Sequence, residues 1–275
     1  MPEFDLTTIG ESLIRLSAPP DTLIESVTRF DVDVVGSESN FARALAMLGR
    51  KTAWCSRLPE NPLGKSVANS LGSAGVDVSL IEWSASGRIG ICYDEIENRS
   101  SSTRLFDRAN SCATKMRVDG INWSRVLSTR LLHLTGITPA LSSSCREVID
   151  EAVLRAKSLG VPISFDVNYH AELWPVLDAR SVLSLLVAEV EFLFIKQRDA
   201  EIVFEVFGSP EQQLHQLSKL TNAKRILLTR NDGTIAWNGG SFGDDAVQRK
   251  SNIDSINVHD TLFANVIDAW LKLDE

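Results

Sequence analysis

From Leu131 onward, short apolar segments alternate with longer segments whose apolar residues recur at helical spacing. Segments of this length and order are typical of right-handed βαβ units, which build a parallel sheet covered by helices on both faces. The pattern therefore predicts an α/β fold, a doubly wound αβα domain. The expected strands are 131–134, 163–166, 192–195 and 225–228, and the expected helices are 144–159, 179–188 and 210–220.

The N-terminal half shows a different pattern, in which polar and apolar residues alternate over short stretches. Segment 4–16 suits an opening strand followed by a turn. Alternation indicates strands with one face toward solvent, and we expect them to form a small β-sheet lid. The lid would be contributed from about residues 12–36 and 88–108 of a single domain that spans residues 1–275. The alternating stretches are 31–35, 90–95 and 103–106.

Polar residues follow several of the expected strands. In doubly wound folds, ligands bind in the crevice at the carboxyl ends of the parallel strands. The sequence therefore predicts that the functional site lies at this edge of the sheet. The polar residues placed there are Asp166, Asn168, Lys196, Thr229 and Asp260.

The 275 residues carry a formal net charge of −8. This charge argues against nucleic acid or an anionic membrane as the main partner, because both favour clustered Lys and Arg. No apolar run approaches the roughly 20 residues needed to cross a bilayer, and residues 1–5 lack the basic and apolar zones of a signal peptide. We expect a cytoplasmic protein that binds a small molecule or another protein.

The four cysteines are widely spaced and form no Cys-x-x-Cys pair. Neither a zinc site nor a disulfide framework is therefore indicated, and reduced, buried thiols are expected. The four histidines likewise lack the spacing of metal ligands.

Several short motifs occur in order along the chain. Examples are Gly36-Ser37-Glu38-Ser39-Asn40, Asp107-Arg108-Ala109-Asn110-Ser111, His133-Leu134-Thr135-Gly136 and Phe165-Asp166-Val167-Asn168-Tyr169. With these motifs the chain resembles the PfkB-type (ribokinase-like) carbohydrate kinases, most closely the 2-keto-3-deoxygluconate kinases. The resemblance implies a ribokinase-like αβα sandwich with a small β-sheet lid. It also implies an enzyme that transfers the γ-phosphate of ATP to a hydroxyl of a sugar or sugar acid, with Mg²⁺ as a cofactor.

The resemblance also implies which residues bind the sugar. Arg108 would bind the carboxylate of a sugar acid through a bidentate fork, and His170 stands where the family usually has an arginine. Two alternatives stay open. Gly36 to Asn40 can be a strand-to-helix turn with an N-terminal cap, and Arg108 can be a surface residue paired with Asp107 or another acid. The implied substrate-binding residues are Gly36, Asn40, Phe106, Arg108, Asn168 and His170.

Asp260 matches the catalytic base of the family. Its carboxylate would accept the proton of the sugar hydroxyl as that oxygen attacks the γ-phosphate. Asp260 can also cap the apolar helical segment 261–273, and the two interpretations are compatible. Segment 229–234 corresponds to the family's nucleotide loop. The implied cofactor-binding residues are Lys196, Thr229, Gly233, Asn257 and His259, and the implied metal residue is Asp199.

The chain departs from the family pattern on the nucleotide side. Directly before the base the family has Gly-Ala-Gly, whose backbone amides stabilise negative charge on the phosphates, whereas this chain has Asn257-Val258-His259. Gln197 and Arg198 stand where acidic residues of the magnesium network are usual, and relatives continue beyond the position of Glu275. Two hypotheses follow: an active sugar kinase, or a catalytically impaired homologue that acts as a sugar-binding or protein-interaction module.

The lid strands also suggest an assembly. In a monomer they would expose strand edges and an apolar face, which favours pairing between two lids. We therefore expect a homodimer through these strands.

Overall fold

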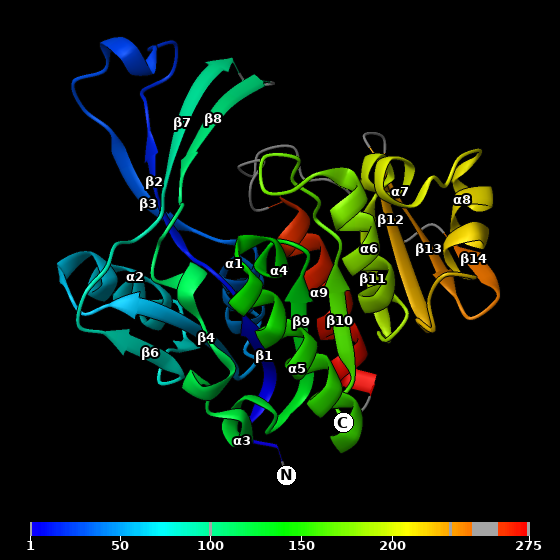
Figure 1. Ribbon diagram of the computed structural model, residues 1–275. Coiled ribbons are helices and arrows are strands. Elements are labelled where there is room, and N and C mark those ends of the chain that lie inside the picture. Colours follow the sequence, from blue (N-terminus) through cyan, green and yellow to red (C-terminus); the bar gives the residue numbers. More distant parts are fainter. Residues whose placement is uncertain (1, 99–100, 231–232, 244–257, 274–275) are drawn as a thin grey trace.

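A parallel sheet forms the centre of the computed structural model, which describes residues 2–98, 101–230, 233–243 and 258–273 (Figure 1). The strand order is β14-β13-β12-β11-β10-β9-β1-β4-β5, and β6 pairs with β4. In this order, all neighbouring strands from β12 to β5 are parallel, as is the pair of β4 and β6. Strand β13 pairs antiparallel with both β12 and β14. The strands are β1 (Phe4–Ile9), β4 (Thr52–Pro59), β5 (Val76–Asp77), β6 (Ile81–Ser84), β9 (Thr129–Thr135), β10 (Ile163–Asp166), β11 (Phe192–Lys196), β12 (Arg225–Arg230), β13 (Gly233–Asn238) and β14 (Ser241–Gly243).

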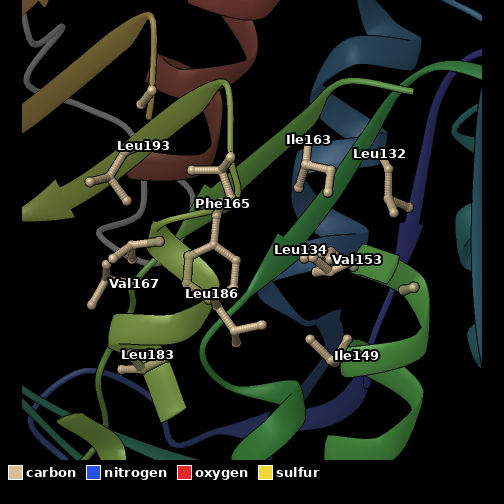
Figure 2. Close-up of a cluster of buried hydrophobic side chains, with 14 of the residues drawn as sticks. Leu132, Leu134, Ile149, Val153, Ile163, Phe165, Val167, Leu183, Leu186 and Leu193 are labelled. Carbon is tan, nitrogen blue, oxygen red and sulfur yellow. The ribbon is translucent and has the colours of Figure 1, made fainter. Parts of the chain in front are cut away.

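Both faces of this sheet are buried, as the nearly continuous apolar runs in its strands require. Leu132 packs in the cluster that Figure 2 shows, against α5 (Ser143–Leu159) and α6 (Val176–Val187). Its neighbour Leu131 belongs to a second cluster, which contains residues of α1, α2 and α9. The predicted αβα sandwich is therefore confirmed. The remaining helices are α1 (Ser37–Met47), α2 (Pro62–Ser73), α3 (Trp123–Val126), α4 (Thr138–Leu141), α7 (Gln197–Phe204), α8 (Pro210–Leu217) and α9 (Val258–Leu273).

The structure adds elements that sequence periodicity did not indicate. Helix α7 directly follows β11 and spans only 8 residues, too few for a clear periodic signal. Segment 229–234, expected as a nucleotide loop, instead joins β12 to β13 as a hairpin whose residues 231–232 lie outside the described ranges. Thr229 pairs with Thr234 and Arg230 with Gly233. In the part of the chain that the structure describes, no helix is both long and apolar enough to cross a membrane.

A second sheet projects from the central one (Figure 1) and has the order β3-β2-β7-β8. We call it the small sheet. Its strands are β2 (Leu13–Ser17), β3 (Asp31–Val35), β7 (Ile91–Asn98) and β8 (Ser101–Asp107). Segment 4–16, expected as one strand, is split between the two sheets, because the chain turns after β1 at Gly10.

The two faces of the small sheet differ in character. On one face Arg15 lies opposite Cys92, and Cys92 lies opposite Phe106. The register places a row of apolar residues on the other face, across all four strands. This row consists of Val32, Leu16, Tyr93 and Leu105.

Candidate functional site

A cavity of about 150 Å³ lies where the small sheet meets the carboxyl ends of the central strands. It brings together all six predicted substrate-binding residues, from segments that are far apart in the sequence, with the predicted base and one predicted cofactor-binding residue. Those that line it are Gly36, Asn40, Phe106, Arg108, Asn168, His170, Asp260 and Lys196. Asp166, predicted at this edge of the sheet, lines it too. It is also lined by residues that were given no role in the sequence analysis, among them Glu11, Ser37, Glu38 and Arg104.

Asp260 lies in the first turn of α9 and is 6% exposed. The helix begins at Val258, so Asp260 is inside the helix and does not cap it. Oδ1 of Asp260 accepts a hydrogen bond from Ser37 Oγ at 3.3 Å, and Oδ2 accepts one from Asn40 Nδ2 at 3.2 Å. Burial, together with the nearby carboxyl of Asp166, raises the pKa of Asp260 to about 8. A carboxyl tuned in this way is suited to accept a proton near neutral pH.

The two donors to Asp260 occupy the first turn of α1. Ser37 and Asn40 are three residues apart, so their side chains lie on the same face of the helix. Gly36 precedes this turn, and a Cβ there would lie 2.3 Å from the carbonyl oxygen of Glu11. The glycine therefore lets the chain pass close to the end of β1. Gly36 is the N-cap of α1, which fits the interpretation of this segment as a strand-to-helix turn. Because glycine has no side chain, it makes no side-chain capping hydrogen bond.

A chain of hydrogen bonds links Asp260 to the ammonium group of Lys196. Lys196 Nζ donates to Asn168 Oδ1 at 2.9 Å, and Asn168 Nδ2 donates to Ser37 Oγ at 3.1 Å. Asn168 has a φ of 35°, in the left-handed region. Such a backbone costs about 1–3 kcal/mol and often occurs at functional sites. The hydrogen bonds with Lys196 and Ser37 help to offset this cost and hold the amide of Asn168 between the cation and the hydroxyl.

Asp166 lies at the end of β10, two residues before Asn168. Burial raises its pKa to about 7, although Lys196 acts in the opposite direction. Its Oδ1 atom is buried and has no hydrogen-bond partner among the described residues. A buried oxygen of this kind is available to a ligand.

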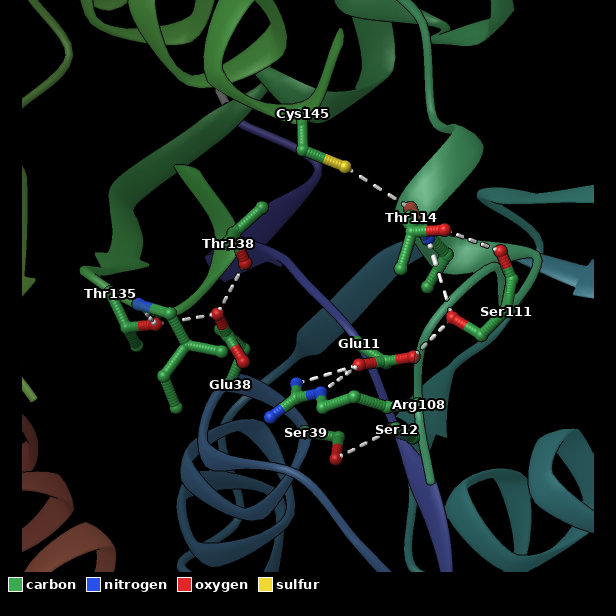
Figure 3. A network of polar contacts seen from close by, with 12 residues as sticks. Glu11, Ser12, Glu38, Ser39, Arg108, Ser111, Thr114, Thr135, Thr138 and Cys145 are labelled. Atoms are coloured by element: carbon green, nitrogen blue, oxygen red, sulfur yellow. Dashed lines mark hydrogen bonds and ion pairs between the residues drawn. The ribbon is translucent and has the colours of Figure 1, made fainter. Parts of the chain in front are cut away.

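Arg108 is held in the wall of the cavity by Glu11 (Figure 3). Arg108 Nη2 lies 2.6 Å from Glu11 Oε2, and Ser111 Oγ donates to Glu11 Oε1 at 2.5 Å. Asp107, the partner considered in the sequence analysis, pairs with Arg88 instead. The Arg108 side chain is only 12% exposed, so it is not a surface residue.

His170 contacts Phe106 across the cavity, with the rings edge to face and their centroids 6.4 Å apart. Burial and, to a smaller extent, Lys196 lower the pKa of His170 to about 4. The imidazole is therefore neutral at pH 7. His170 offers a hydrogen bond where the family usually has a permanent positive charge.

Glu38 follows Ser37 in α1 and lines the cavity. Its carboxyl points to Thr135 and Thr138 (Figure 3). Its Oε1 atom accepts hydrogen bonds from Thr135 Oγ1 at 2.7 Å and from Thr138 Oγ1 at 2.6 Å. Glu38 stands in one of the motifs, and Glu11 lies in the segment expected as the opening strand and turn. Their roles were missed because a carboxylate in a motif does not reveal whether it is buried.

Of the predicted nucleotide residues whose side chains the structure describes, Lys196 lines the cavity, whereas Thr229 and Gly233 do not. Thr229 is buried at the end of β12, and its Oγ1 atom has no partner in the described part of the chain. Asp199 lies in the first turn of α7, where burial raises its pKa and its Oδ2 atom accepts a hydrogen bond from the Tyr169 amide at 3.2 Å. The described residues contain no cluster of three potential metal ligands. Asn257 lies outside the described residues, as does the side chain of His259.

The sequence profile of the pfkB family of carbohydrate kinases matches residues 4–271. The chain belongs to this family. The predicted family and the predicted sugar kinase activity are thus confirmed at family level.

Named relatives of this pfkB family member act on sugar acids. The chain is 33% identical to the 2-dehydro-3-deoxygalactonokinase of Haloferax volcanii, over 93% of this chain and 81% of the relative. It is 29% identical to the 2-dehydro-3-deoxygluconokinase of Thermoproteus tenax, over 88% of this chain and 75% of the relative.

A solved structure agrees with these matches. The crystal structure of 2-dehydro-3-deoxygluconokinase from Thermotoga maritima is 28% identical, with a TM-score of 0.82 over 86% of this chain and 77% of that chain. A PfkB protein from Polaromonas sp. JS666 has a TM-score of 0.88 at 24% identity, over 98% of this chain and 89% of that chain, and supports the fold. The predicted ribokinase-like architecture is confirmed.

Proposed function

We propose that this pfkB family member transfers the γ-phosphate of ATP to a hydroxyl of a 2-dehydro-3-deoxy sugar acid, with Asp260 as the general base. One observation carries the proposal. The buried carboxyl of Asp260 is fixed by Ser37 and Asn40 in a cavity that also contains Arg108. The relatives named for gluconate and galactonate derivatives support the substrate class.

In this proposal the sugar acid lies between Asp260 and the small sheet. Asp260 accepts the proton of the attacking hydroxyl, and the hydrogen bonds from Ser37 and Asn40 hold the carboxylate in position. Arg108 and Arg104 line the opposite part of the cavity and supply positive charge for the carboxylate of the substrate. Phe106 and His170 form the adjacent wall.

ATP and Mg²⁺ enter the proposal through the family. ATP supplies the phosphoryl group, and Mg²⁺ neutralises charge on the phosphates. Lys196 is placed to contact the transferred phosphate, and Thr229 Oγ1 is a buried polar atom available to the nucleotide. Asn257, His259 and Gly233 are proposed to complete the nucleotide side.

The carboxylates of Asp166 and Asp199 fit a metal ion that would bind together with the nucleotide. Mg²⁺ usually keeps several waters and binds one or two carboxylates together with substrate phosphates. The open Oδ1 atom of Asp166 meets this need, and Asp199 is a second candidate.

A coupled assay with ATP, Mg²⁺ and either 2-dehydro-3-deoxygluconate or 2-dehydro-3-deoxygalactonate tests the function. Asp260→Asn keeps the shape of the side chain and is expected to lower kcat by roughly 10²–10⁴. Binding of the sugar acid, measured by calorimetry, should change little. Equal turnover by Asp260→Asn and the wild type would exclude Asp260 as the base.

A second function is favoured by the sequence before the base, Asn257-Val258-His259, which replaces the family's Gly-Ala-Gly. Side chains at the two former glycine positions would hinder close approach of the backbone amides to the phosphates, and loss of one such amide contact lowers rates by about 10²–10³. The protein would then be a sugar-binding or protein-interaction module. Binding of the sugar acid without turnover, and without stabilisation by ATP, supports this alternative over the kinase.

A further inference from the structure

The carboxyl of Glu38 is saturated on one oxygen and open on the other. Glu38 is 1% exposed. Its Oε1 atom accepts the two hydrogen bonds from Thr135 and Thr138. Its Oε2 atom is buried and has no partner among the described residues, although Glu38 lines the cavity. An unsatisfied buried carboxyl oxygen is unfavourable unless a ligand or water completes it.

The surrounding residues fix the orientation of this carboxyl. Thr135 Oγ1 accepts a hydrogen bond from the Ile137 amide at 3.1 Å, so its own hydrogen is directed to Glu38. A Cβ on Gly10 would lie 2.2 Å from Glu38 Cδ. The chain therefore keeps a glycine where the carboxyl needs space. The site is built around the side chain of Glu38.

The two oxygens of the Glu38 carboxyl have different surroundings. Oε1 accepts the hydrogen bonds from Thr135 and Thr138, whereas Oε2 has no partner among the described residues. Burial raises the pKa of Glu38, and the hydrogen bonds from Thr138 and Thr135 act in the opposite direction. Oε2 is therefore able to accept a hydrogen bond, and to donate one when the carboxyl is protonated.

The position of Glu38 on α1 separates it from the reacting end of the substrate. Ser37 and Asn40 direct their polar atoms to Asp260. Glu38 follows Ser37 by one residue, which turns its side chain by about 100° around the helix axis. Its contacts are accordingly with residues at the end of β9 and in α4. Asp260 and Glu38 nevertheless both line the same cavity.

We propose that Glu38 is a specificity-determining residue whose Oε2 atom forms a hydrogen bond with a hydroxyl of the sugar acid other than the one that is phosphorylated. This proposal deepens the proposed function and rests on its substrate class. A site built to bind a substrate hydroxyl discriminates strongly against an analogue that lacks it, because the buried polar group is then unpaired.

The test compares 2-dehydro-3-deoxygluconate and 2-dehydro-3-deoxygalactonate with analogues that each lack one hydroxyl. Dissociation constants are measured by calorimetry without ATP, and kcat/KM is measured in the coupled assay. In the wild type, removal of one non-reacting hydroxyl should weaken binding by roughly 10-fold to 100-fold. If no such analogue binds more weakly than its parent, the proposal is overturned without any variant.

The variant Glu38→Leu tests whether Glu38 is the residue that binds that hydroxyl. It should bind the parent sugar acid as weakly as it binds the analogue, and the analogue should bind as it does to the wild type. Glu38→Gln keeps an acceptor for both threonines and a donor toward the cavity, so its discrimination should stay within about 10-fold of the wild type. Equal weakening of the parent and every analogue by Glu38→Leu would show a structural role only and would overturn the proposal.

Ser39→Ala is the matched control, because Ser39 is a fully buried polar residue of the same helix turn that is not among those lining the cavity. It should leave the discrimination unchanged. The calorimetric arm separates this proposal from the proposed function. Discrimination that depends on Glu38 in a protein without turnover would refute the kinase activity alone, and turnover without such discrimination would refute the role of Glu38 alone.

Discussion

Asn40 donates a hydrogen bond from Nδ2 to Oδ2 of Asp260 over 3.2 Å, although 220 residues separate them in the sequence. The contact exists because α1 and α9 pack together on one face of the central sheet. Phe41 and Phe263 belong to the same buried cluster there. Stacking of Phe263 on Phe194, with ring centroids 4.2 Å apart, fixes α9 against β11. Asp260 and its donors are therefore held by the hydrophobic core.

The pH profile should report the titration of Asp260. A general base acts when deprotonated, and the pKa of Asp260 is raised to about 8. We expect kcat/KM to increase with pH through about 8. Lys196→Met should move the midpoint to higher pH, because Lys196 lowers the pKa of Asp260. A profile that is flat from pH 6 to 9 at the chemical step would contradict Asp260 as a titrating base.

Arg108 should contribute through its planar fork as well as its charge. Arg108→Lys keeps the charge but loses the paired N–H geometry that binds carboxylates. We expect KM for the sugar acid to rise by roughly 10-fold to 100-fold, with a smaller change in kcat. Arg117→Lys is the control, since its side chain is 73% exposed. An unchanged KM in Arg108→Lys would place the carboxylate elsewhere.

The pair of Arg50 and Asp268 should anchor α9. Arg50 Nε lies 2.7 Å from Asp268 Oδ1, and both side chains are nearly buried. Removal of one partner leaves a buried charge, so Arg50→Met should lower the free energy of unfolding by about 3–5 kcal/mol. Lys272 also contacts Asp268, but its side chain is 63% exposed. Lys272→Met should therefore lower the free energy of unfolding by less than about 1 kcal/mol. Urea unfolding measures the free energy of unfolding of both variants. Equal losses of stability in Arg50→Met and Lys272→Met would refute the anchoring role.

His133 should make the fold sensitive to acid. It stacks on Phe41 with ring centroids 3.8 Å apart, and burial lowers its pKa from 6.5 to about 3. Because the unfolded chain binds the proton first, this residue reduces stability as pH falls from about 6.5 to about 3, by up to about 1.4 kcal/mol per pH unit. His133→Phe should flatten this dependence in urea titrations at several pH values. Parallel curves for variant and wild type would show that His133 does not titrate in this range.

The apolar row Val32, Leu16, Tyr93 and Leu105 should pair two small sheets. Val32 is 69% exposed and Leu105 is 55% exposed. We predict a homodimer, and Val32→Lys should dissociate it by placing a charge in the apolar row. Light scattering at micromolar concentration measures the mass. A wild-type mass near 30.3 kDa would contradict the dimer. Leu185→Lys, at an exposed residue of α6, is a control that should not change the mass.

The order of elements was readable from the sequence because it depends on local patterns. Buried parallel strands require apolar runs, and the helices between them require periodic apolar residues. The same logic predicted that Asn168, Lys196 and Asp260 gather at one edge of the sheet, since parallel strands end on the same side. Elements with weak local patterns, such as α7, were not predicted.

The ion-pair and hydrogen-bond partners within the site could not be predicted from the sequence, because they depend on which segments meet in space. Sequence motifs left Arg108 with an open choice of acid, and the fold pairs it with Glu11, 97 residues away. They gave Glu38 no role, and packing encloses it between Gly10 and two threonines.

The sequence by itself thus determined the αβα architecture, the family and the position of Asp260 at the carboxyl edge of the sheet. The tertiary structure alone decided that Asp260 is buried between Ser37 and Asn40, that burial lowers the pKa of His170 to about 4, and that one buried oxygen of Glu38 has no partner among the described residues. The physical reason is that desolvation and hydrogen-bond partners set the charge of a side chain, and both arise only when distant segments pack together.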